Sequence, residues 1–323
     1  MAELGTTNPN FLDWTKTLNP DGSIATVAEI LSETNPIVGD AVVVEANGPT
    51  SHRTTVRTGL PAGTWRRLNY GVQVEKSRTA QVTDTIGMLE AYAEVDKDLA
   101  MLNGNSAAWR MSEDRAFIEG LSQSMADTVV YGNTDSDPEK FLGLHPRYDD
   151  STAENARMVI DDGGSGTDQT SIWGVVWGAD SCHMTFPKGS SAGLSFEDLG
   201  QETLSDAAGG LYEGYRSHYQ WKAGLVVRDW RQVTRIVVDT SVVSSNNLLD
   251  HMADAQNQIN RPNAGRLVWY ANRTMKSRLD KEAMNKTNMA LTTQQQDNGG
   301  PVTLFWGKPV RLLDSILNTE AVY

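Results

Sequence analysis

The chain of 323 residues is acidic, with 41 Asp and Glu against 28 Lys and Arg and a formal net charge of −13. Its length allows one large or two ordinary hydrophobic cores, and an apolar fraction of 39% with nine Trp is typical of a folded protein. The acidity disfavours general adhesion to nucleic acid or anionic lipid, so any contact with a polyanion has to be local.

Cysteine content and hydropathy exclude further classes of protein. Cys182 is the only cysteine, which rules out an intramolecular disulfide and sulfur-rich zinc frameworks and favours a reducing compartment. Residues 1–22 contain neither a basic n-region nor an apolar h-region, and no segment approaches the ~18 apolar residues of a membrane span. We therefore expect a protein made in the cytoplasm, with no membrane contact.

The first predicted elements are a short helix and a strand. Ser23 is suited to cap a helix that ends at Asn35-Pro36, and the apolar run 41–44 is typical of a strand. A turn at 47–49 then leads into a basic segment.

The segment 52–78 is basic although the chain is acidic. Its residues 53–58 alternate with the period of two that predicts a strand, and a second extended run is expected from Val72 to about Thr83. Gly59, Pro61 and Gly63 separate the two. Neither face of this hairpin has enough apolar residues for a core of its own, so it has to lie on another surface. Its candidate contact residues are Arg53, Arg57, Trp65, Arg66, Arg67, Lys76 and Arg78.

Three interpretations of this hairpin are open from the residues alone. It could be a solvated ribbon, or an arm for nucleic acid, although the aromatic residues able to stack on bases are confined to Trp65 and Tyr70. It could also dock on an acidic protein surface, because residues 84–162 contain seventeen acidic against six basic residues. If it docks on a neighbouring copy, the contact is head-to-tail and closes into rings.

Residues 105–131 predict a long amphipathic helix. The stretch has no proline, Gly132 is suited to end it, and ~1.5 Å per residue gives a rod of roughly 38 Å. The expected core positions of this helix recur near the three-and-four spacing and are Met111, Ile118, Leu121, Met125 and Val129.

The rest of the chain mixes strands with helices, which predicts an α+β fold. Strands are expected at 158–160, 172–177, 182–186 and 267–270, a strand pair at 225–230 with 233–238, helices at 248–259 and 272–284, and a closing hairpin at 302–306 with 310–313.

No catalytic, cofactor or metal site is predicted. The glycine cluster 163–166 lacks the Lys-Ser/Thr of a phosphate loop, adjacent acids such as Asp161 and Asp162 point apart in extended chain, and no two of the five His have metal-ligand spacing. An alternative function is a carbohydrate-active enzyme or lectin that uses exposed tryptophans, although burial is the commoner fate of Trp. The tryptophans considered for it are Trp173, Trp177, Trp221, Trp230, Trp269 and Trp306.

Several strings of the chain together resemble the major capsid proteins of tailed bacteriophages, particularly short-tailed ones. The resemblance runs in order from about residue 11 to the end, which makes it more specific than any single motif. The strings are 52–61 with Trp65-Arg66, 112–120, 170–173 with 176–178, 186–190, 229–231, and 307–311 with Asp314 and 319–321.

The resemblance implies a Hong Kong 97-type capsid fold. It implies an N-terminal arm and short helix at 1–47, an extended loop at 48–84, a spine helix and peripheral strands at 85–165, and a mostly axial domain at 166–323 of which part returns to the peripheral domain. It also implies a structural protein rather than an enzyme, which assembles with itself into hexamers and pentamers of an icosahedral head in the virion.

Partners follow from the same resemblance. We expect a separate scaffolding protein, a portal protein, a possible decoration protein, and packaged double-stranded DNA held only by weak non-specific contacts. Covalent linkage of subunits through Lys76 is disfavoured, because nothing around it in the sequence identifies an Asn partner or a catalytic acid.

Overall fold

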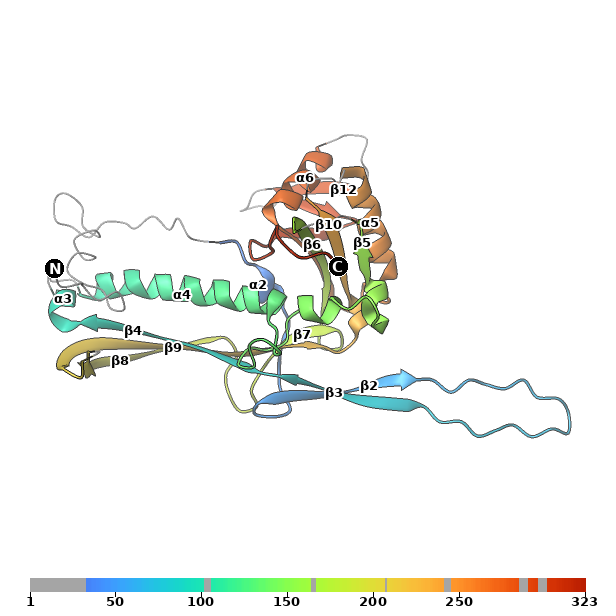
Figure 1. The fold of residues 1–323 in the computed structure, drawn as a ribbon, viewed down its shortest axis with the longest axis horizontal. Helices are drawn as coiled ribbons and strands as arrows, with labels where there is room; N and C mark the ends of the chain where they lie inside the picture. Colours follow the sequence, from blue (N-terminus) through green and yellow to red (C-terminus); the bar gives the residue numbers. More distant parts are fainter. Residues whose placement is uncertain are drawn as a thin grey trace.

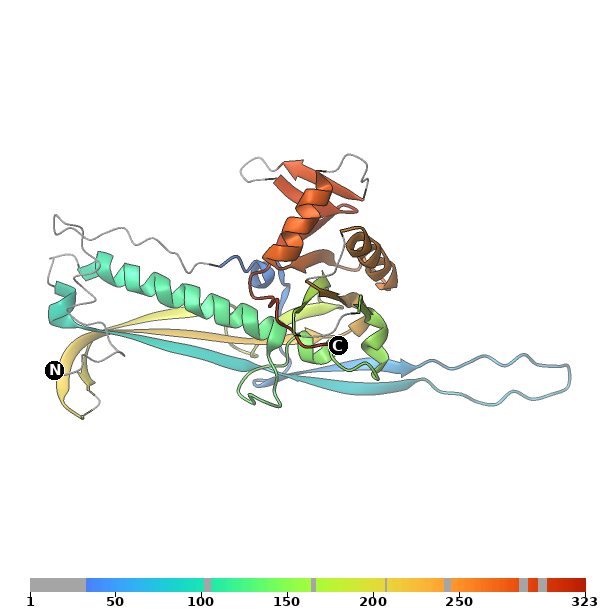
Figure 2. The ribbon, with the colours of Figure 1, turned by 45° about the horizontal axis from the view of Figure 1, so that its top comes forward.

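The computed structural model shows an elongated subunit with a long hairpin that projects from it (Figures 1 and 2). A long helix and the strands beside it extend to one side, the hairpin extends to the opposite side, and a compact body of strands and helices rises between them (Figure 1). The structure describes residues 33–101, 106–163, 167–206, 208–240, 245–284, 290–295 and 301–323.

The long helix is α4, Ser106–Tyr131, within one residue of its predicted start. It lies along an antiparallel sheet in which β9, Leu211–Val227, pairs with β4, Gly87–Asp96, on one side and with β8, Leu194–Ser205, on the other. A short helix α3, Lys97–Met101, follows β4 at the far end.

The predicted core face of α4 is correct for its second half only. Leu121, Met125 and Val129 are buried, whereas Met111 and Ile118 are 58% and 44% exposed. The reason lies in the register of the helix. Its inward face follows positions 110, 114, 117, 121 and 125, and residues 111 and 118 lie about 100° further round. The first part of that face is polar, as Arg110 contacts Asp198 at 2.6 Å and Asp114 accepts a hydrogen bond from the Tyr219 hydroxyl.

The compact body is built around a strand that the sequence predicts well, β6, Gln169–Trp177. It pairs antiparallel with β10, Val233–Asp239, and with β11, Arg266–Ala271, and every residue of β6 and β10 is buried. Helices α5, Ser245–Gln258, and α6, Arg273–Ala283, pack against these strands through one apolar cluster. The members of that cluster from the helices are Leu248, Met252, Ala255, Met275 and Leu279.

The remaining strands extend the same sheet. The closing hairpin is present as β13, Pro301–Phe305, and β14, Lys308–Leu312, with β14 parallel to β11 and β12, Leu291–Gln295, at the outer edge. A short β5, Val159–Asp161, follows the 3₁₀ turns η1, His145–Tyr148, and η2, Glu154–Met158, and pairs parallel with β10.

The predicted pairing of 225–230 with 233–238 is wrong. Residues 225–227 belong to β9, while β10 pairs with β5 and β6. Between them the 3₁₀ turn η3, Trp230–Gln232, turns the chain, and the Asp229 side chain accepts the Arg231 backbone N–H at its start. The two strands therefore belong to the same sheet without being neighbours in it: β10 pairs with β5 and β6, and β9 reaches β6 only through β7.

One short strand joins the two halves of the molecule. β7, Cys182–Phe186, pairs antiparallel with the end of β9, contacts β6, and accepts β1, Val43–Glu45, as a parallel neighbour. A one-turn helix α2, Ile37–Asp40, precedes β1. The helix predicted from Ser23 and residues 164–166 of the glycine cluster lie outside the described residues. None of the described helices is long and apolar enough to cross a membrane.

Candidate assembly surfaces

The projecting hairpin has a paired base and an unpaired tip. β2, Ser51–Gly59, pairs antiparallel with β3, Arg78–Thr85, which places Arg53 opposite Thr83 and Arg57 opposite Thr79. Both arginines are exposed, while Thr54 on the other face is buried, as the period of two predicts.

The predicted second strand starts too early, because residues 60–77 contain no strand. Pro61 has no backbone N–H to donate to a neighbouring strand, and Gly63 and Gly71 lose more conformational entropy on ordering than other residues. Inter-strand hydrogen bonding through this stretch is therefore weak. Asn69 also adopts a positive φ of 68°, which breaks the extended geometry.

The hairpin tip, defined here as residues 60–77, exposes an apolar and basic surface. Trp65 is fully exposed and Val74 is 99% exposed. The other exposed large apolar residues of the tip are Leu60, Leu68, Tyr70 and Val72. Within the part of the chain that the structure describes, none of the six predicted cations of the hairpin forms an ion pair. Apolar exposure of this extent on one segment is typical of a contact site for another molecule.

The base of the hairpin, in contrast, is fixed by polar contacts, of which the one at Asp84 is buried. Asp84 of β3 is 5% exposed and its Oδ1 accepts a hydrogen bond from Nη2 of Arg147 at 2.7 Å. The same Arg147 nitrogen donates to the backbone oxygens of Leu142 and Leu225. On β2, the Asn47 side chain brackets Arg53, accepting its N–H at 2.9 Å and donating to its carbonyl oxygen at 2.6 Å. The arm is therefore anchored at one end and free at the other.

Two histidines lie beside this anchor. The rings of His52 and His183 are 5.7 Å apart, and neither ring nitrogen of His183 has a hydrogen-bond partner among the described residues. Burial, with the neighbouring His52, lowers the pKa of His183 to about 4. Within the described ranges, no three His, Cys, Asp or Glu side chains are grouped so that they could hold a metal ion.

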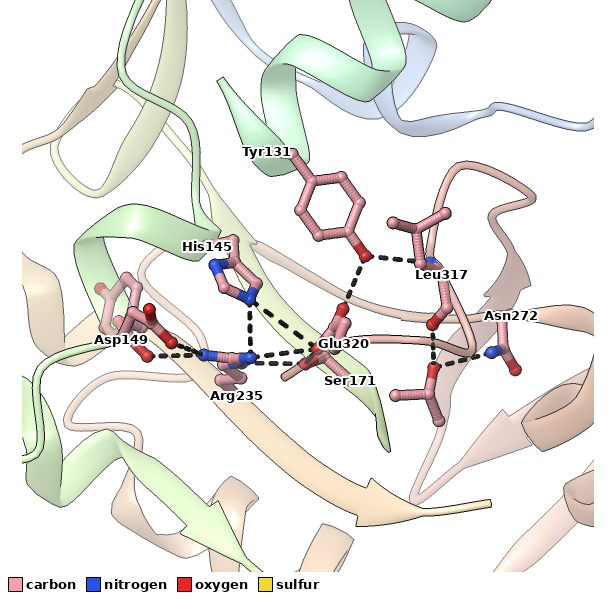
Figure 3. A network of polar contacts seen from close by, with 10 residues as sticks. Tyr131, His145, Asp149, Ser171, Arg235, Asn272, Leu317 and Glu320 are labelled. Carbon is pink, nitrogen blue, oxygen red and sulfur yellow. Dashed lines mark hydrogen bonds and ion pairs between the residues drawn. The ribbon is translucent and has the colours of Figure 1, made fainter. Parts of the chain in front are cut away.

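A buried polar clasp joins α4 to the compact body (Figure 3). Arg235 of β10 is fully buried, and its Nη2 contacts Glu320 Oε2 at 3.0 Å while its Nε donates to the Ser171 hydroxyl at 2.8 Å. Glu320 is 4% exposed and also accepts a hydrogen bond from the Tyr131 hydroxyl at 2.6 Å. Tyr131 is the last residue of α4, so the clasp ties the helix end, the sheet and the C-terminal segment together.

The polar groups around Arg235 are placed so that its guanidinium has acceptors on several sides. Nη1 of Arg235 contacts Asp149 at 3.1 Å, and Nη2 lies 2.9 Å from His145 Nε2. Burial, with the nearby Arg235, lowers the pKa of His145, which keeps its ring neutral and able to accept that hydrogen bond. Burial and Glu320 raise the pKa of Tyr131, so its hydroxyl stays a donor.

Sequence reasoning did not predict the clasp. The signal in the sequence is an arginine in the middle of the apolar run 233–238, since a buried guanidinium requires a carboxylate partner. Which of the 41 acids supplies it is decided by a contact across 85 positions.

The tryptophans do not form the exposed platform that the lectin alternative requires. Of the six tryptophans considered, Trp173, Trp177 and Trp269 are buried, Trp221 and Trp230 are half-buried, and Trp306 is 47% exposed. The Trp177 indole N–H donates to the Tyr270 hydroxyl at 2.9 Å. The enzyme or lectin alternative therefore finds no support in the fold.

Comparison with known proteins agrees with this architecture. The family model described as major capsid protein GP7 matches residues 19–323. A chain from the near-atomic structure of bacteriophage Epsilon15 is 35% identical, with 99% of each chain covered and a TM-score of 0.79. The capsid of bacteriophage JBD30 shares the fold at 11% identity and a TM-score of 0.51, over 89% of this chain and 93% of that one. No curated protein matches the chain.

An extended arm, a spine helix along a narrow sheet and a compact sheet body are the parts expected of a Hong Kong 97-type subunit, and both the family model and the Epsilon15 chain cover nearly all of them. The chain belongs to the GP7 family of major capsid proteins, and it is a structural protein of a tailed-phage head.

Proposed function

We propose that this capsid protein forms hexamers and pentamers of an icosahedral head around double-stranded DNA, and that the hairpin 48–84 is the arm by which each copy holds its neighbour. The observation that supports this is the exposed tip, whose cations form no ion pair with any described residue and whose apolar side chains are exposed. The contact residues on the arm would be Arg53, Arg57, Trp65, Arg66, Arg67, Lys76 and Arg78.

The proposed division of the subunit follows the layers of the fold. We assign 1–47 to the N-terminal arm, and α4 with β4, β8 and β9 to the peripheral domain, so that the segment 194–227 returns from the axial part of the chain. The sheet around β6 with α5 and α6 would surround the capsomer axis.

Further partners are proposed from the family to which the chain belongs. Head assembly in the cytoplasm of a bacterial host would require a separate scaffolding protein and a portal protein, with a decoration protein as a further candidate. Contact with the packaged DNA would stay weak and non-specific, since the chain has a formal net charge of −13.

Charge reversal at the tip tests the arm. Arg66→Glu combined with Arg67→Glu is expected to reduce assembly into shells and lower the salt concentration at which shells dissociate, because each exposed pair contributes ~0–1 kcal/mol but recurs in every copy. The matched control, Arg66→Lys with Arg67→Lys, keeps the charge and is expected to assemble. Sedimentation and negative-stain microscopy give the readout. The arm contact would be refuted if the Glu variant formed shells that dissociate at the same salt concentration as those of the wild type.

A further inference from the structure

A groove lies between the start of β4, the second half of α4 and the loop that follows α4. Its volume is about 310 Å³, which is near the lower end of roughly 300–1,000 Å³ for ligand-sized sites. Its apolar lining comes from Met88, Leu89, Met125 and Phe141, and its polar lining includes Asp127, Glu139 and Lys140. The groove is thus apolar inside and mainly acidic at its edge.

Among the described residues, the two acids at this edge are not held in an ion pair. Neither Asp127 nor Glu139 forms an ion pair or a side-chain hydrogen bond within the described part of the chain, whereas Lys140 is paired with Asp137 at 3.0 Å. Partial burial raises the pKa of Asp127, and Glu33 raises it further while Lys140 opposes both. A cation brought from outside would relieve this unfavourable charge.

The hairpin tip offers the complementary chemistry. Trp65 is fully exposed and is followed at once by Arg66 and Arg67. Tryptophan and arginine are among the residues most enriched at the energetic centres of protein interfaces, where an aromatic anchor fills a pocket. The tip therefore matches the groove in both its apolar and its charged parts.

The tip cannot reach the groove of its own subunit. The groove begins at Gly87, just after β3 ends at Thr85, so it lies at the base of the hairpin. Trp65 is fourteen positions beyond Ser51, which at ~3.3 Å per residue places it on the order of 45 Å from that base. Figure 1 shows the hairpin extending away from this part of the molecule. The occupant has to be the tip of a second copy.

We propose that Trp65 of one copy inserts into the groove between β4 and α4 of the next copy, with Arg66 and Arg67 facing Asp127 and Glu139. This inference rests on the proposed assembly function and names the receiving surface for it. Each subunit carries one tip and one groove at different places, so the contact is head-to-tail and closes into a ring.

Two other surfaces fit the tip less well. A second cavity of about 220 Å³ near β7 and β9 is lined by Lys222, which has the same charge as the tip. The exposed Met111 and Ile118 on α4 lie on either side of Arg115, also a cation. Charge favours the groove over both.

Site-directed cross-linking tests the contact in assembled shells. Thr64→Cys places a thiol beside Trp65, and Ser124→Cys places one in the groove. The native Cys182 does not compete, because it is fully buried and burial raises its pKa to about 12. Treatment of shells of the double variant with a short bismaleimide is expected to give a ladder of covalent oligomers beyond the dimer on a denaturing gel. The matched control pairs Thr64→Cys with Lys222→Cys, in the second cavity, and is expected to stay monomeric.

The outcomes separate this inference from the function on which it rests. Shells without a ladder, or a ladder in the Lys222→Cys control instead, would overturn the groove contact while the assembly function stands. A wild-type chain that forms no shells or capsomers would overturn both. Hydrogen exchange on unmodified protein gives a second readout. Amides of 124–128 and 139–141 should be protected in wild-type shells relative to free subunits, and that protection should be lost with Trp65→Ala. Equal exchange in shells and free subunits also contradicts the proposal.

Discussion

Glu320 shows how a single residue holds distant parts of the subunit. Its carboxylate is buried between Arg235, Ser171 and Tyr131, which come from two strands and the end of α4. Removing one partner of a buried ion pair leaves the other charge uncompensated, which typically costs roughly 3–5 kcal/mol.

We predict that Glu320→Ala lowers the free energy of unfolding of the free subunit by about 3–5 kcal/mol, measured by urea denaturation. Arg273→Ala is the matched control, because Arg273 also binds the C-terminal segment, through Asp314 at 2.8 Å, but is 75% exposed. The control is expected to change stability far less. Equal effects of both variants would mean that burial of the clasp is energetically unimportant.

His183 makes stability depend on pH. Burial and His52 lower its pKa from 6.5 to about 4, with the Gly178 backbone opposing, Arg228 acting in the same direction as burial, and Asp84 opposing. His183 therefore becomes protonated below about pH 6.5 in the unfolded chain, but only near pH 4 in the folded chain. The stability contribution is complete above pH 6.5 and is lost as the pH falls toward 4.

We expect the free energy of unfolding of the wild type to fall relative to that of His183→Phe by roughly 3 kcal/mol between pH 7 and pH 4. His52 and His145 also have lowered pKa values but titrate in both proteins, so the difference reports on His183 together with its coupling to His52. Urea denaturation at a series of pH values gives the measurement. A difference that does not change with pH would show that His183 is solvated when the protein is folded.

At the scale of elements, α4 contains a glycine that its position does not require. Gly120 is exposed in the middle of the helix, and a Cβ there would meet no atom within 4 Å. Gly132, just after the helix, is different, because a Cβ would lie 2.4 Å from the carbonyl oxygen of Phe141. The first position offers space for a side chain and the second does not.

We predict that alanine at these two positions of α4 and its end changes the stability of the subunit in opposite directions. Gly120→Ala should raise the free energy of unfolding of the free subunit by about 0.5–1 kcal/mol, because glycine in a helix interior is entropically costly. Gly132→Ala should lower it by about 1–3 kcal/mol, through overpacking against backbone atoms. Thermal or urea unfolding distinguishes the two. A destabilising Gly120→Ala would mean that the helix is strained at this residue.

At the scale of the whole molecule, charge separates the arm from the rest of the chain. The cations of the hairpin tip are exposed, while the formal net charge of the subunit is −13. An excess of negative charge on most of the surface repels duplex DNA at long range, and the Debye length of ~8 Å at 0.15 M salt restricts attraction to the tip itself.

Free subunits are accordingly expected not to bind duplex DNA at about 0.15 M salt, and to bind it weakly only at much lower ionic strength. Fluorescence anisotropy with a labelled duplex measures this, and Arg66→Glu with Arg67→Glu is the control that should abolish the low-salt binding. Tight binding at 0.15 M salt would instead favour the interpretation of the hairpin as a nucleic-acid arm.

Features that depend only on residues close together in the chain can be predicted from the sequence alone. The period of two in 53–58, the helical spacing and lack of proline through 131, and the apolar runs of β6, β7 and β10 each follow from local geometry. The absence of a core within the hairpin was also evident from its composition.

Features that depend on contacts between distant segments follow only from the three-dimensional fold. The inward face of α4 is set by the sheet beneath it, so Met111 and Ile118 stay exposed despite their spacing. The pairing of β9 with β4, the choice of Glu320 for Arg235, and the groove beside the base of the hairpin all join residues far apart in the chain. These contacts are stabilised by burial and charge pairing, which depend on where the side chains lie in space. A periodic pattern along the sequence carries no information on that position.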